Sequence, residues 1–84
     1  MVKKTELTLG TSAAYQICVC GNLDEELSAY LQGLTVAHSP TGKEQQLTIL
    51  TGRLTNQAAL LGVLNALYNL AMPLISVEFL EESE

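Results

Sequence analysis

The feature that most constrains this chain is a nearly uncharged stretch over residues 56–80, in which Glu78 is the single charged residue. The spacing predicts a helix that is capped by Thr55 or Asn56 and ends near Ala71. A helix that lies on a sheet normally carries charges on its outer half. This helix has none, so the chain must fold or assemble in a way that covers most of its surface.

The apolar side chains of the predicted helix extend beyond the stripe that one sheet would cover. At helical spacing, Leu60, Leu64, Leu67 and Ala71 form the stripe, Leu61 and Tyr68 form one flank, and Val63 and Leu70 form the other. Only a narrow uncharged strip of Gly62, Asn65 and Asn69 remains for solvent. We therefore expect the flanks to make contacts beyond the sheet of the same chain.

Three kinds of structure would cover such a helix. A transmembrane span over residues 58–77 has the required length of about 20 residues, but it contains Asn65 and Asn69 and lacks basic flanks. Burial within the chain is the second alternative, since isolated exposed apolar residues are common. We favour burial against another chain, because contiguous apolar patches mark interfaces, and a homodimer is the commonest symmetric assembly.

Periodic segments elsewhere predict four strands and a second helix. The strands are expected over residues 15–20, 34–39, 45–54 and 74–80. A helix of about ten residues is expected after Asn22, which forms a capping box with Glu25, and should stop at Gly33. The order β-α-β-β-α-β predicts a ferredoxin-like α+β fold, with an antiparallel sheet in the order 4-1-3-2 and two helices on one face.

The expected domain organisation follows from these elements. Residues 1–14 are expected to be a flexible lead-in, residues 15–80 a single domain, and residues 81–84 an acidic tail. A chain of 84 residues has a marginal core unless something adds to it.

Charge and cysteine content narrow the functional classes. The formal net charge is −5, and the few basic residues are scattered. Binding to nucleic acid or to anionic lipid is therefore not expected. The N-terminal sequence lacks the apolar run of a signal peptide, and two cysteines at i and i+2 do not resemble a disulfide framework. We expect a cytoplasmic protein with reduced thiols.

No catalytic set can be assembled from the sequence. Cys18 and Cys20 share a strand face, but no base can be assigned to them. His38 is the one histidine, whereas a metal site needs about four ligands. The acids at residues 24–26 complement the dipole of the predicted helix. We therefore expect no enzymatic activity, no cofactor and no metal.

One candidate ligand site can still be named. Gly21, Asn22 and Asp24 lie in a turn whose backbone N–H groups are expected to be free. Arg53 precedes the long helix, whose N-terminus could hold an anion. The alternative for Arg53 is a surface salt bridge.

Residues 50–78, LTGRLTNQAALLGVLNALYNLAMPLISVE, carry a resemblance to a known group of proteins. The matching residues are Gly52, Gln57, Ala58, Ala59, Leu60 and Gly62, followed by Pro73, Leu74, Ser76 and Val77. This pattern resembles the C-terminal half of small uncharacterised bacterial proteins, and the resemblance implies no particular activity. The order of elements also resembles that of ACT-like regulatory domains, which is a likeness of folds alone.

These observations favour a non-enzymatic interaction domain, either a homodimer or a small subunit of a partner protein. The alternative is an ACT-like regulatory domain that binds a small molecule at the turn of residues 21–24. The two hypotheses depend on different residues: the flanks of the long helix in the first, and the turn of residues 21–24 in the second.

Overall fold

Strand β1 (Ala13–Cys20) lies inside an antiparallel sheet that has one buried face. Its residues alternate without interruption between buried and half-buried. Tyr15, Ile17 and Val19 are buried beneath the helices, whereas Cys18 and Cys20 are half-buried on the opposite face. The period of two in the sequence therefore correctly predicts this strand.

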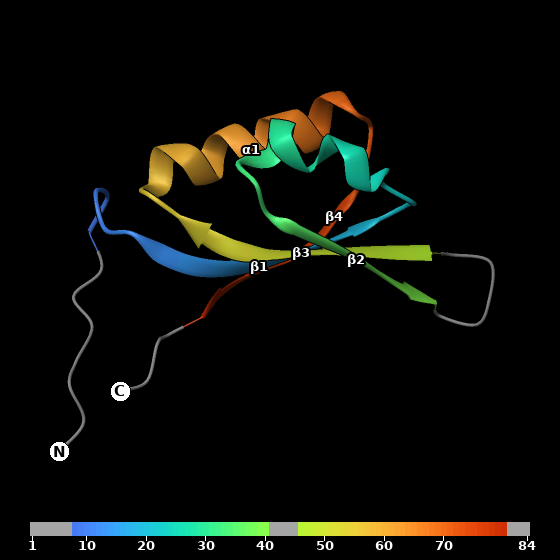
Figure 1. Ribbon diagram of the computed structural model, residues 1–84, viewed down its shortest axis with the longest axis horizontal. Helices are drawn as coiled ribbons and strands as arrows, with labels where there is room; N and C mark the ends of the chain where they lie inside the picture. Colours follow the sequence, from blue (N-terminus) through green and yellow to red (C-terminus); the bar gives the residue numbers. More distant parts are fainter. Residues whose placement is uncertain (1–7, 41–45, 81–84) are drawn as a thin grey trace, which may run out of the picture.

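The computed structural model describes residues 8–40 and 46–80, and its four-stranded sheet has the order β2-β3-β1-β4 (Figure 1). The other strands are β2 (Thr35–Pro40), β3 (Gln46–Leu54) and β4 (Leu74–Leu80). A 3-10 helix, η1 (Glu25–Leu31), and an α-helix, α1 (Gln57–Asn69), lie together on one face of the sheet (Figure 1). Within the described residues, the other face carries no helix.

The hydrophobic core fills the space between the helical layer and the sheet. Its buried side chains are Ala13, Tyr15, Ile17, Val19, Leu23, Leu31, Leu34, Leu50, Leu54, Val63 and Leu67. Each buried side chain of leucine size stabilises the fold by about 1.5–3 kcal/mol relative to an exposed one. β4 contributes none of these side chains, although it is rich in apolar residues.

The first helical segment is not an α-helix, so the predicted ferredoxin-like fold with two α-helices is wrong for this chain. η1 is a 3-10 helix of seven residues, and its first turn contains a hydrogen bond of 2.9 Å from Leu27 N to Asp24 O. Asp24, and not Asn22, is the N-cap, because its carboxylate accepts a hydrogen bond of 3.0 Å from Glu26 N.

Two anchors explain why this segment is short and tightly wound. Leu23, which the sequence prediction includes in the helix, is instead buried in the core ahead of it, and its N–H donates to Thr48 Oγ1. At the other end, Gln32 and Gly33 have φ angles of 62° and 73°, a left-handed conformation that stops the helix. The short segment left between these anchors is wound as a 3-10 helix, a form that proteins use in short pieces.

Helix α1 begins and ends close to its predicted limits. Asn56 is the N-cap, and its Oδ1 accepts a hydrogen bond of 2.8 Å from Ala59 N. The chain leaves the helix at Ala71, whose φ is 62°, two residues ahead of Pro73. No helix in the described ranges 8–40 and 46–80 is long and apolar enough to span a membrane.

The buried side of α1 is rotated from the predicted stripe. Val63 and Leu67 are its buried residues, at 1% and 2% exposure. Leu60 and Leu64, which the prediction places at the centre of the stripe, are half-buried along one margin. This rotation decides which flank of the helix is left without contacts.

The predicted lead-in is partly structured. Gln57 N donates to Leu9 O at 2.9 Å, so the chain before β1 is held against the start of α1. β1 itself begins at Ala13, two residues earlier than predicted. Residues 1–7 and the predicted acidic tail at 81–84 lie outside the described residues.

Candidate interaction surface

Strand β4 lies at one edge of the described sheet, where it pairs with β1. Phe79 is opposite Tyr15, and Val77 is opposite Ile17. Because directly opposed residues of an antiparallel pair point to the same face, Phe79 and Val77 are on the side of the helices. A β-bulge interrupts this ladder at Ile75.

The helical layer does not extend over β4. Tyr15 and Ile17 are 3% and 0% exposed, whereas the opposing Phe79 and Val77 are 38% and 37% exposed. Leu74 and Ile75, at the start of the strand, are about half exposed. β4 therefore presents a row of apolar side chains along an edge whose outer backbone groups pair with no strand of the described residues.

One flank of α1 borders this row. Leu61 and Tyr68 are 60% and 81% exposed, and they lie on one side of the helix because they are seven residues apart. On the same side, Gln57 Nε2 donates to the Tyr15 hydroxyl at 3.2 Å. Tyr15 meets Phe79 edge to face, with ring centroids 5.9 Å apart. These contacts place the flank above β1 and next to β4.

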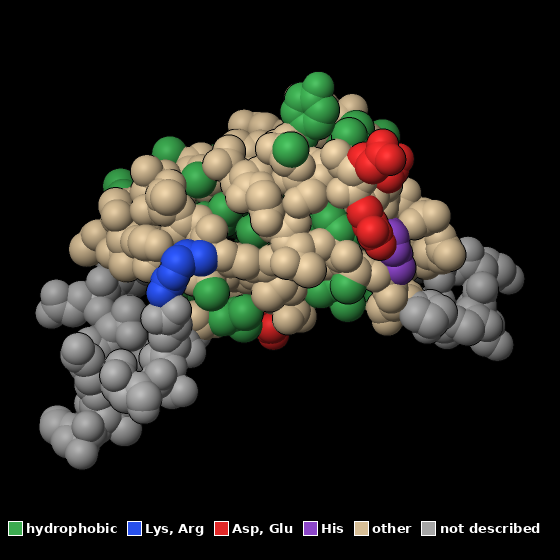
Figure 2. All heavy atoms as spheres, viewed as in Figure 1, with side chains coloured by type: hydrophobic (Ala, Val, Ile, Leu, Met, Phe, Trp, Pro, Cys, Tyr) green, Lys and Arg blue, Asp and Glu red, His purple; other side chains and the backbone are tan. Residues whose placement is uncertain are grey.

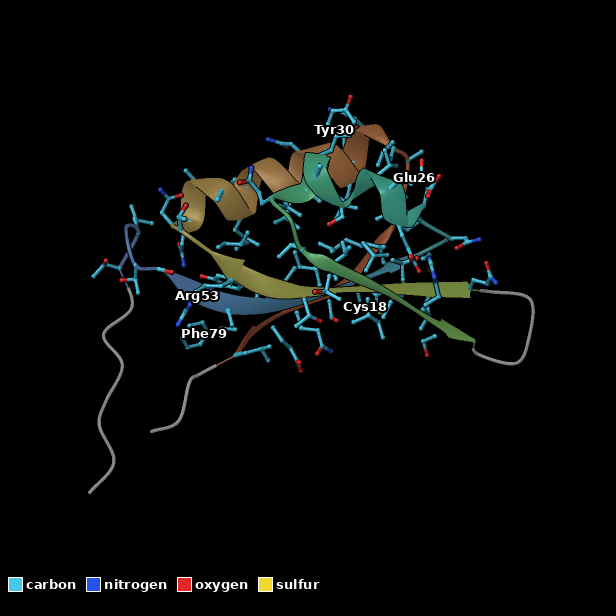
Figure 3. The ribbon with its side chains drawn as sticks, viewed as in Figure 1. Cys18, Glu26, Tyr30, Arg53 and Phe79 are labelled. Atoms are coloured by element: carbon cyan, nitrogen blue, oxygen red, sulfur yellow. The ribbon has the colours of Figure 1, made fainter. Side chains whose placement is uncertain are left out.

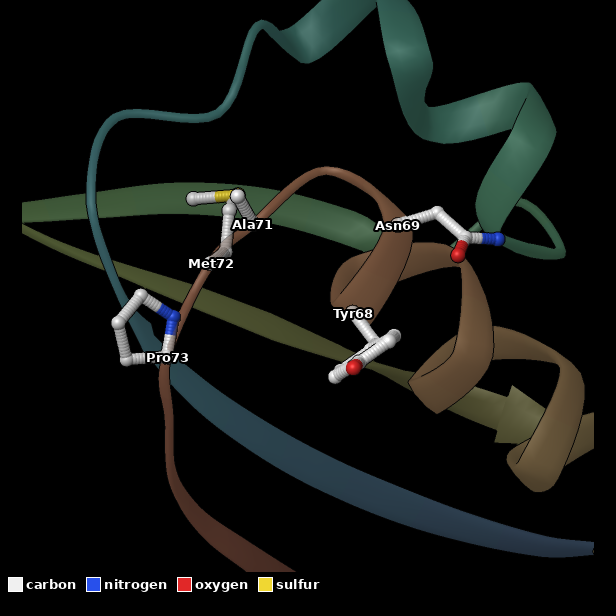
Figure 4. A pocket seen from close by; sticks show the side chains of 5 residues that line it. All are labelled: Tyr68, Asn69, Ala71, Met72 and Pro73. Atoms are coloured by element: carbon white, nitrogen blue, oxygen red, sulfur yellow. The ribbon is translucent and has the colours of Figure 1, made fainter.

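The end of α1 and the start of β4 line a shallow, wide-open hollow of about 510 Å³ (Figure 4). Its lining residues are Tyr68, Asn69, Ala71, Met72 and Pro73. Since Pro73 directly precedes β4, the hollow joins the flank of the helix to the exposed strand. The name β4–α1 surface is used below for Leu61, Tyr68, Leu74, Ile75, Val77 and Phe79.

The other flank of α1 packs against η1 within the same chain. Leu27, Tyr30 and Leu31 of η1 and Ala66, Asn69 and Leu70 of α1 together line a hollow of about 260 Å³. Leu70 is 45% exposed but belongs to this contact. The two flanks of α1 therefore differ, because one is packed within the chain and the other borders uncovered β4.

No charged side chain belongs to the β4–α1 surface. Glu78, the one charged residue of β4, lies opposite Gln16 on the other face of the sheet. Acidic side chains gather instead beside His38, over η1 and β2 (Figure 2). An uncharged apolar surface is suited to contact with another apolar surface and not to a charged ligand.

Gly21, Asn22 and Asp24 do share one turn, but its backbone is bonded within the chain. The Thr48 hydroxyl donates to Gly21 O at 2.7 Å and accepts from Leu23 N at 3.1 Å. A further contact of 2.7 Å joins His38 Nε2 to Leu23 O. The Leu23 N–H is thus not available to a ligand, and the shallow hollow of about 490 Å³ beside the turn is largely acidic.

Arg53 is not part of this turn. Arg53 lies on β3, opposite Ala14 of β1, and this end of β1 is remote from Gly21. Figure 3 shows Arg53 far from Glu26 of η1. Two N–H groups at the N-terminus of α1 already donate to Asn56 Oδ1 and to Leu9 O. The four residues predicted to bind a ligand therefore do not form one site.

Thr48 fixes the turn after β1, and we expect Thr48→Val to destabilise the fold by about 2–4 kcal/mol. Thr48 is fully buried, so the substitution removes the partner of two backbone groups, each worth roughly 1–3 kcal/mol when left unpaired. Urea denaturation followed by circular dichroism measures the loss. Thr48→Ser retains the hydroxyl and should cost about 1 kcal/mol, for the lost methyl group. Equal effects of the two substitutions would show that the hydroxyl is not the anchor.

The predicted interface residues fall into three environments. Leu61 and Tyr68 are exposed on the β4–α1 surface, and Leu70 lies against η1. Val63 is 1% exposed in the core, so it cannot contact another chain in this fold. The sequence prediction named no residue of β4 as part of an interface, whereas the structure leaves Val77 and Phe79 partly exposed there. The expected strand order already placed this strand at an edge of the sheet, and that signal could have identified them.

The described part of the chain contains no disulfide and no cluster of metal-binding side chains. Cys18 and Cys20 form no disulfide within the described residues, and both are half-buried on the open face of the sheet. Cys18 is opposite Ile49 on one side and Ser76 on the other. Among the described residues, no group of three or more His, Cys, Asp and Glu side chains is placed to hold a metal ion.

The fold and this surface define a small α+β domain with one uncovered apolar edge. Residues 14–78 match a family described as a domain of unknown function (DUF8691), and the chain belongs to that family. No curated protein and no solved structure matches the chain.

Proposed function

We propose that this chain is a non-enzymatic interaction domain that binds another polypeptide chain through the β4–α1 surface. The observation that carries the proposal is the exposure of Val77 and Phe79 at 37–38%, beside β1 neighbours that are at most 3% exposed. A soluble chain that leaves such a row uncovered loses hydrophobic stabilisation of about 25 cal/mol for each Å². A partner chain would restore it.

The uncovered edge strand supports the same proposal. Proteins normally protect an exposed edge with charged residues, proline or a covering loop. β4 has Pro73 only ahead of its first residue, and its one charge, Glu78, is on the face away from the helices. Among residues 8–40 and 46–80 no strand covers this edge. The edge therefore offers backbone hydrogen bonds, and the apolar row offers burial, which is the combination that strand addition uses.

A small-molecule regulator has weaker support from the same contacts. The turn of residues 21–24 is fixed by Thr48 and His38. Its neighbouring hollow is wide open and lined by acids. The proposed interaction takes place in the cytoplasm, where thiols that form no disulfide, such as those of Cys18 and Cys20, stay reduced.

Light scattering of the full chain tests the proposal. We expect either a mass above the 9.0 kDa of one chain or a second protein that co-purifies in fixed stoichiometry. Tyr68→Ser should weaken that association, and Tyr30→Ser is its matched control, because the two rings are 81% and 79% exposed but Tyr30 lies outside the β4–α1 surface. A monomer without a stoichiometric partner, or equal effects of the two substitutions, would contradict the proposal.

A further inference from the structure

We infer that the occupant of the β4–α1 surface is a second copy of this chain, whose β4 pairs antiparallel with the first about a two-fold axis at Val77. The inference rests on the proposed function and adds the partner and the register. Two sheets of the order β2-β3-β1-β4 then become one continuous sheet of eight strands. The exposed edge strand of each copy becomes a central strand.

Symmetry limits the registers that are possible. A two-fold axis perpendicular to the sheet keeps every side chain on its own face, so opposed residues are both helix-facing or both on the open face. One residue must therefore lie on the axis, opposite the same residue of the second copy, and the axis cannot fall between two successive residues of β4. For β4 the central choices are Ser76, Val77 and Glu78.

Charge and packing select Val77 from these three. An axis at Glu78 places two carboxylates directly opposite each other, which is destabilising. An axis at Ser76 leaves Phe79 opposite Pro73, outside the strand of the second copy. An axis at Val77 pairs Val77 with itself and Ile75 with Phe79, while Glu78 is opposite the neutral Ser76. This register centres the pairing within β4, and the regular ladder ends at the β-bulge, because the bulge turns Leu74 towards the helices while Leu80 is on the open face.

The exposed area is sufficient for a small, stable interface. Large side chains carry roughly 150–250 Å² each, so six of them at 37–81% exposure leave on the order of 600 Å² of mostly apolar surface. A standard interface takes about 800 Å² from each partner. The backbone of β4 and the half-buried Leu60 and Leu64 at the margin of α1 supply the remainder.

The same axis also explains the exposed flank of α1. It places the helical layers of both copies on one side of the joined sheet, so the two flanks face each other across the paired β4 strands. Side chains must then fill the space above Val77 and Phe79. Tyr68 and Leu61 are long and uncharged, and their 81% and 60% exposure leaves them free to cover it.

Disulfide trapping tests this register. In a Cys18→Ser, Cys20→Ser background, Val77→Cys places each thiol opposite its own copy, with Cα atoms about 4.5–5.5 Å apart. That separation permits a disulfide. Ser76→Cys is the matched control, because its own copy is displaced by two residues, roughly 8 Å away. Mild oxidation of the full chain should link Val77→Cys at least about tenfold more than Ser76→Cys, with circular dichroism unchanged.

Each other result overturns a defined part of the argument. A dimer in solution in which Val77→Cys does not link, or links no more than Ser76→Cys, overturns the register while the proposed function survives. It would point to another surface, such as the open face around Ile49. A monomer that holds a different protein in fixed stoichiometry overturns the second copy as occupant. A monomer with no partner overturns the inference and the proposed function together.

Discussion

Leu61→Glu should convert the proposed dimer into a folded monomer, whereas Leu67→Glu should unfold the chain. Leu67 is 2% exposed in the core, and an unpaired carboxylate buried there costs several kcal/mol. The whole stability of a small domain is of similar size, about 5–15 kcal/mol. Leu61 is 60% exposed within one chain, so its carboxylate stays hydrated as long as no second chain covers it.

Light scattering and circular dichroism of the same samples distinguish these outcomes. Leu61→Glu should keep a native spectrum while the mass falls to that of one chain, and Leu67→Glu should lose the spectrum. Leu67 is a sharper control than Leu64, because Leu64 is half-buried at the margin of α1. If Leu61→Glu also unfolds the chain, α1 is rotated from the orientation described above. If it changes neither mass nor spectrum, its flank lies outside the interface.

The strands were predictable from the sequence because their signals are local. β4 has the predicted bounds, and β2 and β3 begin within one residue of theirs. The alternation from Tyr15 to Cys20 correctly separates the buried and open faces of β1. Asn56 was also one of two predicted caps for the long helix. Each of these features depends on neighbours within a few residues in the chain.

The first helix could not be predicted in the same way, because a distant residue determines where it starts. Thr48 is 25 residues from Leu23 and holds it through the backbone N–H. This contact removes Leu23 from the helical pattern and moves the cap from Asn22 to Asp24. The sequence after Asn22 has the pattern of a capped helix with one apolar face. The hydrogen bond between Leu23 and Thr48 nevertheless determines where the helix begins.

The candidate interface was predicted in part, and the error has a geometric cause. Helical spacing alone places Leu61 and Tyr68 together, but it cannot say which stripe faces the sheet. Taking Leu60 and Leu64 as the centre assigned Val63 to a flank, whereas the structure buries it. The exposure of β4 depends on how far a helix of 13 residues and a short η1 extend across the sheet. That extent is a property of the packing and not of any local pattern.

Val77→Glu should raise the dissociation constant of the proposed dimer by about 100-fold or more without unfolding the chain. The two-fold axis at Val77 would place the two new carboxylates directly opposite each other, roughly 5 Å apart. Both are ionised at pH 7, and their repulsion at that distance is about 3 kcal/mol for an effective dielectric constant near 20. A loss of about 2.7 kcal/mol is a factor of 100 in affinity. Because Val77 is 37% exposed in the single chain, the monomer can hydrate the carboxylate.

A charge-complementation experiment tests whether Val77 of one copy lies opposite Val77 of the other. Val77→Lys should dissociate the dimer for the same reason, and Val77→Thr, which is similar in shape and neutral, should leave it assembled. Mixing the Val77→Glu and Val77→Lys chains should restore a dimer, because the axis then pairs opposite charges. Sedimentation velocity of each variant and of the mixture provides the measurement. A dimer that tolerates Val77→Glu, or a mixture that stays monomeric, would show that Val77 does not lie opposite its own copy.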